Sequence, residues 1–291
     1  MSGVWNYANM RIFITGNRGQ LGRALTDALA GHTLACGDLP ELDIASYEDV
    51  RRVIADCQPD VVINAAAYTD TAGCERNPDL AFRVNALGVQ SLALACAATG
   101  AALLHISTNE VFDGRQTTPY RELDTPNPLN TYARSKLAGE WYAQALCPRF
   151  YIVRTAWLYG EGTSNFIHKI TRLADQQGAL SVVTDEIATP TSAFDLARAI
   201  ATLIERPIYG IYHFTNSGQC SRFEWARCIL DLTGRRHIPI TPTTMAAFGG
   251  ISTKPAYSVL HNFCGATLGI TLRPWQEALE EFLAGKSAMG S

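Results

Sequence analysis

Residues 11–22 of the chain read RIFITGNRGQLG, in which a short apolar run is followed at once by glycines 16, 19 and 22. A helical pattern begins directly after this turn. A glycine-rich turn between a first strand and a helix lets the backbone approach a pyrophosphate, which free N–H groups and the helix dipole then stabilise. The G-x-x-G-x-x-G stretch therefore predicts a dinucleotide-binding loop. Its expected cofactor contacts are Gly16, Arg18, Gly19, Gln20, Leu21 and Gly22.

Outward from this loop, short apolar runs alternate with amphipathic ones. We expect strands at 11–15, 33–36, 60–64, 102–107 and 151–155. Helices are expected between them, at 19–30, 46–56, 78–98 and 131–144. Strands that alternate with helices of this length form βαβ units, whose parallel strands are covered by helices on both faces. The predicted fold is α/β, a Rossmann-like doubly wound parallel sheet.

The later part of the chain predicts a smaller substrate lobe. Beyond residue 157 the alternation loosens, and turn residues separate shorter helices at 165–175, 192–205 and 222–232. A strand-like segment at 210–214 can return to the main sheet, so we expect a discontinuous C-terminal lobe. We assign residues 10–156, with a returning segment near 192–215, to a dinucleotide-binding domain, and residues 157–191 and 216–284 to the lobe. Residues 1–9 and 285–291 are expected to be flexible tails.

Composition and charge exclude several classes of partner. The chain has 291 residues, a net charge of −3 and no block of Lys and Arg, so we expect no nucleic-acid partner. The longest apolar stretch, around 92–104, is broken at Thr99-Gly100 and is too short to cross a membrane. The N-terminal residues lack the basic start and apolar core of a secretory signal, which favours the cytoplasm.

Cysteine and histidine spacing predicts no metal site. Eight cysteines form no C-x-x-C pair, and six histidines form no H-E-x-x-H pair. Structural zinc sites usually need such closely spaced ligands. We therefore expect free, mostly buried thiols and no bound metal.

Two side chains bear on which dinucleotide binds. Asp38 ends the second strand, where a carboxylate can accept the ribose hydroxyls and repel a 2′-phosphate. Arg18 lies inside the loop, where a guanidinium could clasp that phosphate. We expect NADPH, with NADH as the alternative. Further expected contacts are Ala65, Ala66 and Ala67 after the third strand, and Asp43 and Ile44 beside the adenine.

A tyrosine and a lysine one helical turn apart form the expected catalytic pair. Pro126, Pro128 and Asn130 precede a helix that begins near 131, which places Tyr132 and Lys136 on one face. An ammonium beside a phenol favours phenolate, so we expect Lys136 to lower the pKa of Tyr132. Such a tyrosine can donate a proton to a carbonyl oxygen as hydride arrives.

The fourth predicted strand ends in Ser107-Thr108-Asn109-Glu110, at the sheet edge where doubly wound folds bind ligands. The Thr108 hydroxyl is our candidate for a hydrogen bond to a substrate carbonyl. Ser107 competes for this role.

Together, the glycine loop, Thr108 and the Tyr132–Lys136 pair resemble the extended short-chain dehydrogenase/reductase family in order and spacing. Within it the chain looks most like the dTDP-4-dehydrorhamnose reductases. The similar segments are NAAAYT (64–69), STNEVFDG (107–114), NTYARSKLAGE (130–140), RTAWLYG (154–160), ATPTS (188–192) and KPAYSVL (254–260).

The resemblance implies reduction of the C4 ketone of a dTDP-linked deoxy keto-sugar, dTDP-6-deoxy-L-lyxo-4-hexulose. Tyr132 would be the acid, Lys136 its tuner and a ribose ligand, and Thr108 the carbonyl anchor. Trp157 would lie against the sugar, and Lys254 could meet the diphosphate.

Asn109 and Glu110 would also contact substrate, but they stand where many members carry Asp-Tyr. This departure leaves the choice of sugar open.

Other functions remain compatible with these residues. The same scaffold serves other nucleotide-deoxysugar 4-ketoreductases and nucleotide-sugar epimerases, although the latter usually have a larger C-terminal lobe. The regulatory subunit of methionine adenosyltransferase resembles the same reductases, and it would bind nucleotide and a partner protein without turning over a sugar. A homodimer is allowed but not required.

Overall fold

The computed structural model describes residues 9–162 and 165–289. Six parallel strands form the central sheet, in the order β10-β5-β4-β3-β1-β2. Their bounds are β1 Arg11–Thr15, β2 Thr33–Gly37, β3 Val61–Asn64, β4 Ala102–Thr108, β5 Phe150–Thr155 and β10 Gly210–His213. The chain winds from β1 to β2 in one direction and through β3, β4 and β5 in the other. The predicted doubly wound α/β fold is confirmed, and its switch point lies between β1 and β3, where such folds bind ligands.

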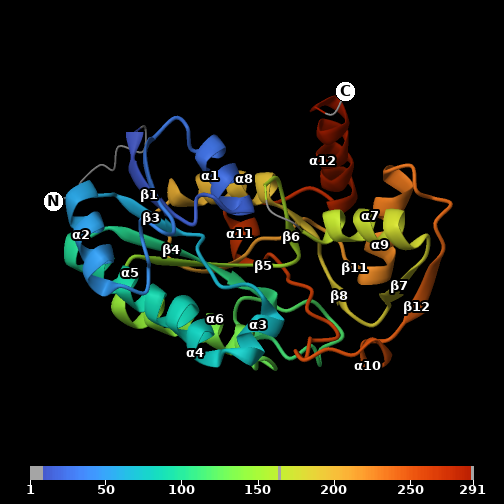
Figure 1. Cartoon of the computed structure of the whole chain (residues 1–291). Helices are drawn as coiled ribbons and strands as arrows, with labels where there is room; N and C mark the ends of the chain where they lie inside the picture. The colour runs from blue at the N-terminus through green and yellow to red at the C-terminus, as the bar shows by residue number, and fades with distance from the viewer. Residues whose placement is uncertain (1–8, 163–164, 290–291) are drawn as a thin grey trace.

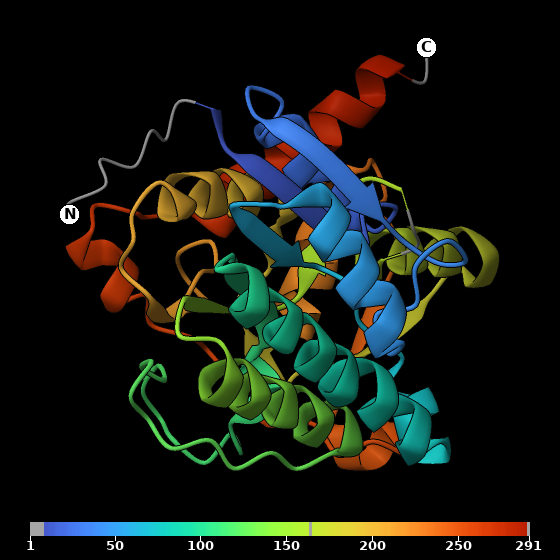
Figure 2. The ribbon, with the colours of Figure 1, turned by 90° about the vertical axis from the view of Figure 1, so that its left-hand side faces the viewer.

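Helices cover both faces of the sheet (Figures 1 and 2). Alternation along β1 sends Ile12 and Ile14 into one core and Phe13 into the other. The first core contains α1 Gln20–Ala28 and α8 Ala193–Ile204. The second contains α2 Tyr47–Cys57, α5 Gly88–Thr99 and α6 Thr131–Leu146. The inner strands are thereby buried between two helical layers, whereas the edge strand β2 is only partly covered.

The helical run Pro78–Thr99 consists of three segments, α4 Pro78–Phe82, the π-helical turn η2 Arg83–Leu87 and α5. By length and composition alone this run could cross a membrane, but 56% of its apolar window is buried inside the protein. It packs against α2 and α6. Its apolar character is therefore accounted for by the core.

Short elements and three further helices form the smaller part of the molecule. The helices are α7 Phe166–Gln177, α9 Arg222–Leu232 and α12 Trp275–Met289. Pairs of short strands accompany them: β6 Leu158–Tyr159 with β9 Thr191–Ser192, β7 Leu180–Val183 with β12 Ile240–Thr243, and β8 Ile187–Ala188 with β11 Cys220–Ser221. An aromatic core around Trp225 and Tyr159 joins α7, α9 and α12. The remaining short helices are α3 Thr71–Arg76, η3 Asn109–Val111, α10 Met245–Phe248 and α11 Cys264–Thr267.

The chain ends differ in part from expectation. α12 continues to Met289, so residues 285–289 belong to a helix instead of a tail. Residues 1–8 and 290–291, also expected in the tails, lie outside the described residues.

All eight cysteines are free, but Cys36 is exposed and three others are only half-buried, so the prediction of buried thiols holds for four of the eight. Within 9–162 and 165–289, no group of three or more His, Cys, Asp or Glu side chains could hold a metal ion.

Candidate functional site

The first and third glycines of the loop are required by close packing. Gly16 has φ +70°, and a Cβ on it would lie 2.6 Å from the backbone nitrogen of Ala66. A Cβ on Gly22 would lie 2.2 Å from the carbonyl oxygen of Gly16. Gly19 is the N-cap of α1 and brings no side chain to the helix start. The loop therefore presses against the end of β3 and leaves backbone N–H groups for an anion, which fits a dinucleotide pyrophosphate.

Two predicted cofactor contacts have their side chains elsewhere. The Gln20 side-chain oxygen accepts hydrogen bonds from the backbone N–H of Gly160 (2.8 Å) and from Asn165 Nδ2 (3.0 Å). Leu21 is buried in the core between the sheet and α8. Helical periodicity turns one of these side chains toward the loop at 160–165 and the other toward the sheet. Only their backbone groups are free to face a cofactor.

Arg18 and Asp38 contact each other at the end of β2. The Arg18 backbone N–H donates to Asp38 Oδ2 (3.1 Å), while its guanidinium donates to the Leu39 carbonyl and to Glu41 Oε1 (3.0 Å). Arg18 and Glu41 both have largely exposed side chains. Sequence reasoning missed Glu41. Its carboxylate is paired with the guanidinium that we expected to bind a 2′-phosphate.

The predicted adenine contacts are turned inward. The Asp43 carboxylate accepts the backbone N–H of Ala45 (2.9 Å) and so closes its own turn. Ile44 is buried, and a Cβ added to Gly88 of α5 would lie 2.8 Å from its side chain. Packing against α5 therefore accounts for the burial of Ile44, and the adenine contacts of Asp43 and Ile44 stay predictions.

The half-buried loop of Ala65, Ala66 and Ala67 follows β3 and is held by an asparagine that sequence reasoning missed. Asn85 accepts the backbone N–H of Tyr68 (2.8 Å) and donates to the Tyr68 carbonyl (3.0 Å). It also donates to Ser135 Oγ (3.0 Å), between the two catalytic candidates on α6. Asn85 lies in the π-turn η2, a feature often found at functional sites. It links the cofactor edge to α6.

Tyr132, Lys136 and Glu140 follow one another at intervals of four on α6, so they share a face. Lys136 is 2% exposed. Its Nζ donates to the Ile106 carbonyl (2.6 Å) and lies 3.3 Å from His105 Nε2, both on β4. The lysine is therefore anchored to the strand that carries Thr108.

The pKa of Tyr132 corrects our expectation. Burial raises it above its ordinary value, the charge of Glu110 raises it further, and a hydrogen bond from Thr108 lowers it in part. Burial lowers the pKa of Lys136 to about 7, against the opposing charge of Glu140. Lys136 thus does not lower the pKa of the phenol, because its nitrogen is directed to β4 and has itself lost affinity for a proton. A protonated Tyr132 suits a proton donor.

The structure distinguishes the two hydroxyls at the end of β4. Thr108 lies close enough to the Tyr132 phenol to shift its pKa, and its hydroxyl donates to Asn109 Oδ1 (3.3 Å) and accepts the backbone N–H of Glu110 (3.2 Å). Ser107 Oγ donates instead to Glu140 Oε1 (2.5 Å), whose carboxylate forms a fully buried ion pair with Arg154 (2.7 Å). Alternation along the strand turns Ser107 away from Tyr132. Thr108 is therefore the hydroxyl beside the phenol.

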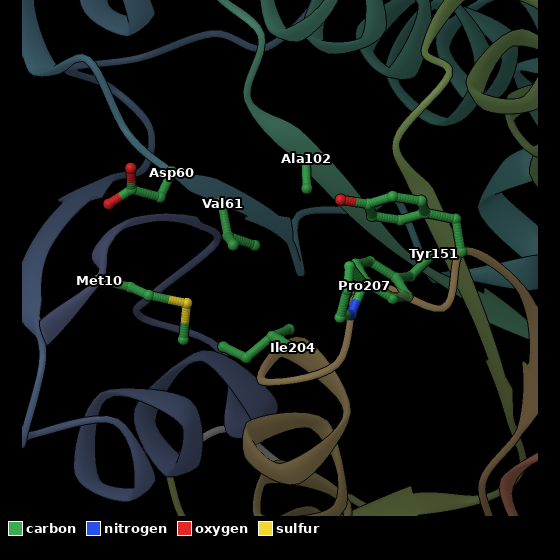
Figure 3. Close-up of a pocket in the computed structure, with 8 residues that line it drawn as sticks. Met10, Asp60, Val61, Ala102, Tyr151, Ile204 and Pro207 are labelled. Atoms are coloured by element: carbon green, nitrogen blue, oxygen red, sulfur yellow. The ribbon is translucent and has the colours of Figure 1, made fainter. Parts of the chain in front are cut away.

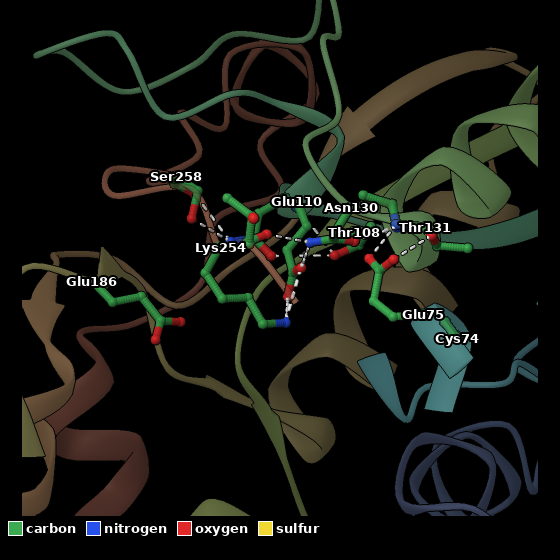
Figure 4. A network of polar contacts seen from close by, with 12 residues as sticks. Cys74, Glu75, Thr108, Glu110, Asn130, Thr131, Glu186, Lys254 and Ser258 are labelled. Carbon is green, nitrogen blue, oxygen red and sulfur yellow. Dashed lines mark hydrogen bonds and ion pairs between the residues drawn. The ribbon is translucent and has the colours of Figure 1, made fainter. Parts of the chain in front are cut away.

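An ion pair borders this group on the side of the smaller part (Figure 4). Lys254 Nζ contacts both Glu110 oxygens, at 2.7 and 3.0 Å. Asn130, the N-cap of α6, donates to Glu110 Oε2 (2.7 Å) and to the Thr253 carbonyl (2.9 Å). Asn109 Nδ2 donates to Ser258 Oγ (2.7 Å). Glu110 and Asn109 thus both bind the segment 253–258, and Lys254 is already paired.

Trp157 belongs to the aromatic cluster of the smaller part. The Arg222 guanidinium lies 3.7 Å from its ring centroid, and the ring stacks with Trp225 at 5.5 Å and 8°. Its backbone has φ +42°, which is unusual for a residue with a side chain. The half-buried indole has these contacts whatever else it binds, and a sugar contact stays a prediction.

Comparison with known proteins agrees with this geometry. A family model described as the RmlD substrate binding domain matches residues 10–287. The chain belongs to this RmlD family.

Two relatives and one solved structure illustrate the similarity. SpsK, a spore coat polysaccharide biosynthesis protein of Bacillus subtilis, is 39% identical over 96% of this chain and 98% of its own length. The dTDP-4-dehydrorhamnose reductase of Mycolicibacterium smegmatis is 41% identical over 94% of this chain and 85% of its own. The Bacillus anthracis dTDP-4-dehydrorhamnose reductase, crystallised with NADP, has a TM-score of 0.92 at 36% identity over 95% of this chain and 99% of that one.

The structure of this RmlD family member contains two further cavities, the second of which is lined in part by Gln20 of the glycine loop. A cavity of about 20 Å³, room for about one water, sits at the amino edge of the sheet beside Met10, Asp60 and Tyr151 (Figure 3). A larger one of about 220 Å³ lies between α1, α8 and α12. The carboxyl edge, with the glycine loop and Tyr132, is on the other side of the sheet from the first cavity.

Proposed function

We propose that this RmlD family member is an NADPH-dependent reductase of the C4 ketone of dTDP-4-dehydro-L-rhamnose, giving dTDP-L-rhamnose. The observation that carries the proposal is the meeting of Thr108, Tyr132 and Lys136 at the sheet edge that holds the glycine loop. The relative from Mycolicibacterium smegmatis, named for this reaction, supports the substrate. The Bacillus anthracis structure with NADP supports the cofactor.

Tyr132 is the proposed acid. Its raised pKa keeps the phenol protonated at neutral pH, so it can donate that proton to the ketone oxygen as the carbonyl carbon is reduced. When bound, NADPH supplies the hydride that the carbon receives. The Thr108 hydroxyl, already beside the phenol, would hydrogen-bond the same oxygen and hold it in place. Lys136 would bind the ribose of the cofactor.

The cofactor is held by backbone more than by side chains. Gly16, Gly19 and Gly22 would admit the pyrophosphate, with the Ala65–Ala67 loop against the nicotinamide half. We propose that a 2′-phosphate binds Arg18 and displaces Glu41, and that Asp38 accepts the ribose hydroxyls when the cofactor is NADH. NADH, which lacks that phosphate, would leave the Arg18–Glu41 pair intact.

Substrate would lie between the two parts of the chain. We assign residues 10–156 and the segment near 192–215 to the dinucleotide, and residues 157–191 and 216–284 to the sugar nucleotide. The proposed determinants of sugar choice are Glu110, whose charge acts on Tyr132, its ion-pair partner Lys254, and Asn109, with Trp157 as a further proposed sugar contact. The enzyme would act on this small molecule in the cytoplasm.

The test is a steady-state assay with the keto-sugar nucleotide and NADPH. We expect substrate-dependent loss of the reduced nicotinamide absorbance and dTDP-L-rhamnose as the product. Tyr132→Phe should bind dinucleotide as before but lose about 10²- to 10⁴-fold in rate, the usual contribution of a positioned acid. Unchanged turnover by Tyr132→Phe would remove it from the mechanism. Dinucleotide binding with no turnover would instead favour another keto-sugar or the non-catalytic regulatory function.

A further inference from the structure

A row of buried polar side chains runs beneath the site and ends at Lys136. Strand register places Thr15, Asn64 and His105 side by side on β1, β3 and β4. All three are 0% exposed. Thr15 Oγ1 donates to Asn64 Oδ1 (2.7 Å), Asn64 Nδ2 lies 3.1 Å from His105 Nδ1, and His105 Nε2 lies 3.3 Å from Lys136 Nζ. The row thus connects the residue before Gly16 to the lysine.

The row fixes which ring nitrogen carries a proton. Because Thr15 donates to the amide oxygen, the amide N–H of Asn64 faces His105, and Nδ1 accepts. The ring is neutral, since burial holds the pKa of His105 well below its usual range. A neutral ring has one proton. That proton is therefore on Nε2 and points at Lys136.

An N–H group donates a hydrogen bond to the lone pair of a neutral amine. An ammonium has no lone pair, so the same N–H group repels it. We propose that His105, held in one tautomer by Asn64 and Thr15, is a positioning residue that favours the neutral amine of Lys136. The other groups that face this amine are the Ile106 carbonyl, which accepts one of its protons, and Glu140 and Tyr132 on its own helix. Of these, Glu140 favours the ammonium but is already paired with Arg154.

The positioning role of His105 rests on the proposed function, because Tyr132 loses its proton only if the enzyme reduces a ketone. After Tyr132 donates its proton, the phenol must be restored. A lysine that binds and releases a proton near neutral pH, one turn away on α6, suits that task. His105 would act only through Lys136, not on substrate.

The test is the titration of Lys136 itself. The chain contains four lysines, so lysine labelled with ¹³C at Cε gives a simple NMR spectrum, and Lys136→Met assigns the signal. His105→Gln replaces the ring by an amide that can turn its oxygen to Nζ. We expect the midpoint to rise by about one pH unit, a tenfold gain in proton affinity. Thr15→Val frees the Asn64 amide to turn, so a smaller rise is expected.

His213 supplies the matched control. It is also 0% exposed and lies on β10, with its ring 3.4 Å from Arg154 and 3.1 Å from the Tyr120 carbonyl. His213→Gln should leave the Lys136 midpoint unchanged. If His105→Gln fails to fold, Thr15→Val decides.

An unmoved midpoint in the folded variants would overturn the proposal. A midpoint that moves in a protein that reduces no keto-sugar would support the coupling and reject the proposed function. If the enzyme is active, the pH profile of kcat in His105→Gln should move with the midpoint, which a loss of packing alone would not cause.

Discussion

The Arg18 guanidinium can pair with Glu41 or with the 2′-phosphate of NADPH, and this competition predicts a cofactor preference. Its guanidinium is paired with the exposed Glu41, while its backbone is bound to Asp38. Arg18→Ala should weaken NADPH binding by about 1–3 kcal/mol, as for the loss of a charge-assisted hydrogen bond, and should leave NADH almost unaffected. Fluorescence titration with both cofactors measures this. Glu41→Gln, which frees the guanidinium, should strengthen NADPH binding alone. Equal losses for both cofactors in Arg18→Ala would remove Arg18 from the phosphate site.

Lys136 makes a prediction about stability and pH. Burial lowers its pKa to about 7 in the folded protein, and an unfolded lysine has a pKa of about 10.4. Between these two pH values the unfolded chain binds one more proton than the folded chain, so the free energy of unfolding rises with pH. The destabilisation by the buried ammonium is therefore complete below pH 7 and is lost as the pH rises toward about 10.

Urea unfolding of the native chain and of Lys136→Met measures this contribution. We expect the stability advantage of Lys136→Met to be larger at about pH 6 than at about pH 9. Lys169→Met, at an exposed position, should show no such trend. An advantage that is equal at both pH values would mean that Lys136 titrates alike in the folded and unfolded states.

At the scale of single residues, sequence spacing could predict those residues whose position depends on one helix or one strand. Tyr132, Lys136 and Thr108 could be predicted because a helical turn and a strand end are visible in the sequence, and their catalytic roles stay predictions. His105, Asn64 and Asn85 were missed because their partners lie 17 to 50 residues away. The pKa of Tyr132 was wrong in direction because only the folded structure shows where the Lys136 nitrogen is directed.

Helix α6 begins at a residue that also belongs to the site. Asn130 accepts the backbone N–H of Ala133 (2.8 Å) as the cap and donates to Glu110 (2.7 Å). Asn130→Ala should cost about 1 kcal/mol of stability through the cap. It should also raise KM for the keto-sugar, because Glu110 loses a donor beside Tyr132.

Ser46→Ala separates these two effects. Ser46 caps α2, where its side chain accepts the backbone N–H of Asp49. Its loss should lower stability to a similar extent in chemical unfolding, with KM unchanged. If Asn130→Ala also left KM unchanged, Glu110 would have no part in substrate binding.

Elements with a clear period were predicted well, and those set by tertiary contact were not. β1 and α9 have the predicted bounds, and each of the other strands of the main sheet differs by one residue. The run expected as one helix from 78 to 98 contains the π-turn η2, whose Asn85 is held by the loop after β3. α12 extends past the expected end of the lobe, to Met289.

At the scale of the molecule, one sheet edge collects residues from distant parts of the chain. The glycine loop follows β1, Thr108 ends β4, Tyr132 and Lys136 come from α6, and Lys254 comes from the smaller part. The alternation of strands and helices predicted this edge, since parallel strands end on the same side. It could not predict that Glu110 and Lys254 would pair across the two parts, because 144 residues separate them.

The central claim is that hydride passes from the nicotinamide to C4 of the sugar at this edge. The most direct measurement uses NADPH with both C4 hydrogens of the nicotinamide replaced by deuterium, with the keto-sugar nucleotide, followed by NMR of the product. We predict dTDP-L-rhamnose with one deuterium at C4 and stoichiometric oxidation of the cofactor. Product without deuterium at C4, or a changed sugar with no net oxidation of the cofactor, would contradict the reductase and favour an epimerase.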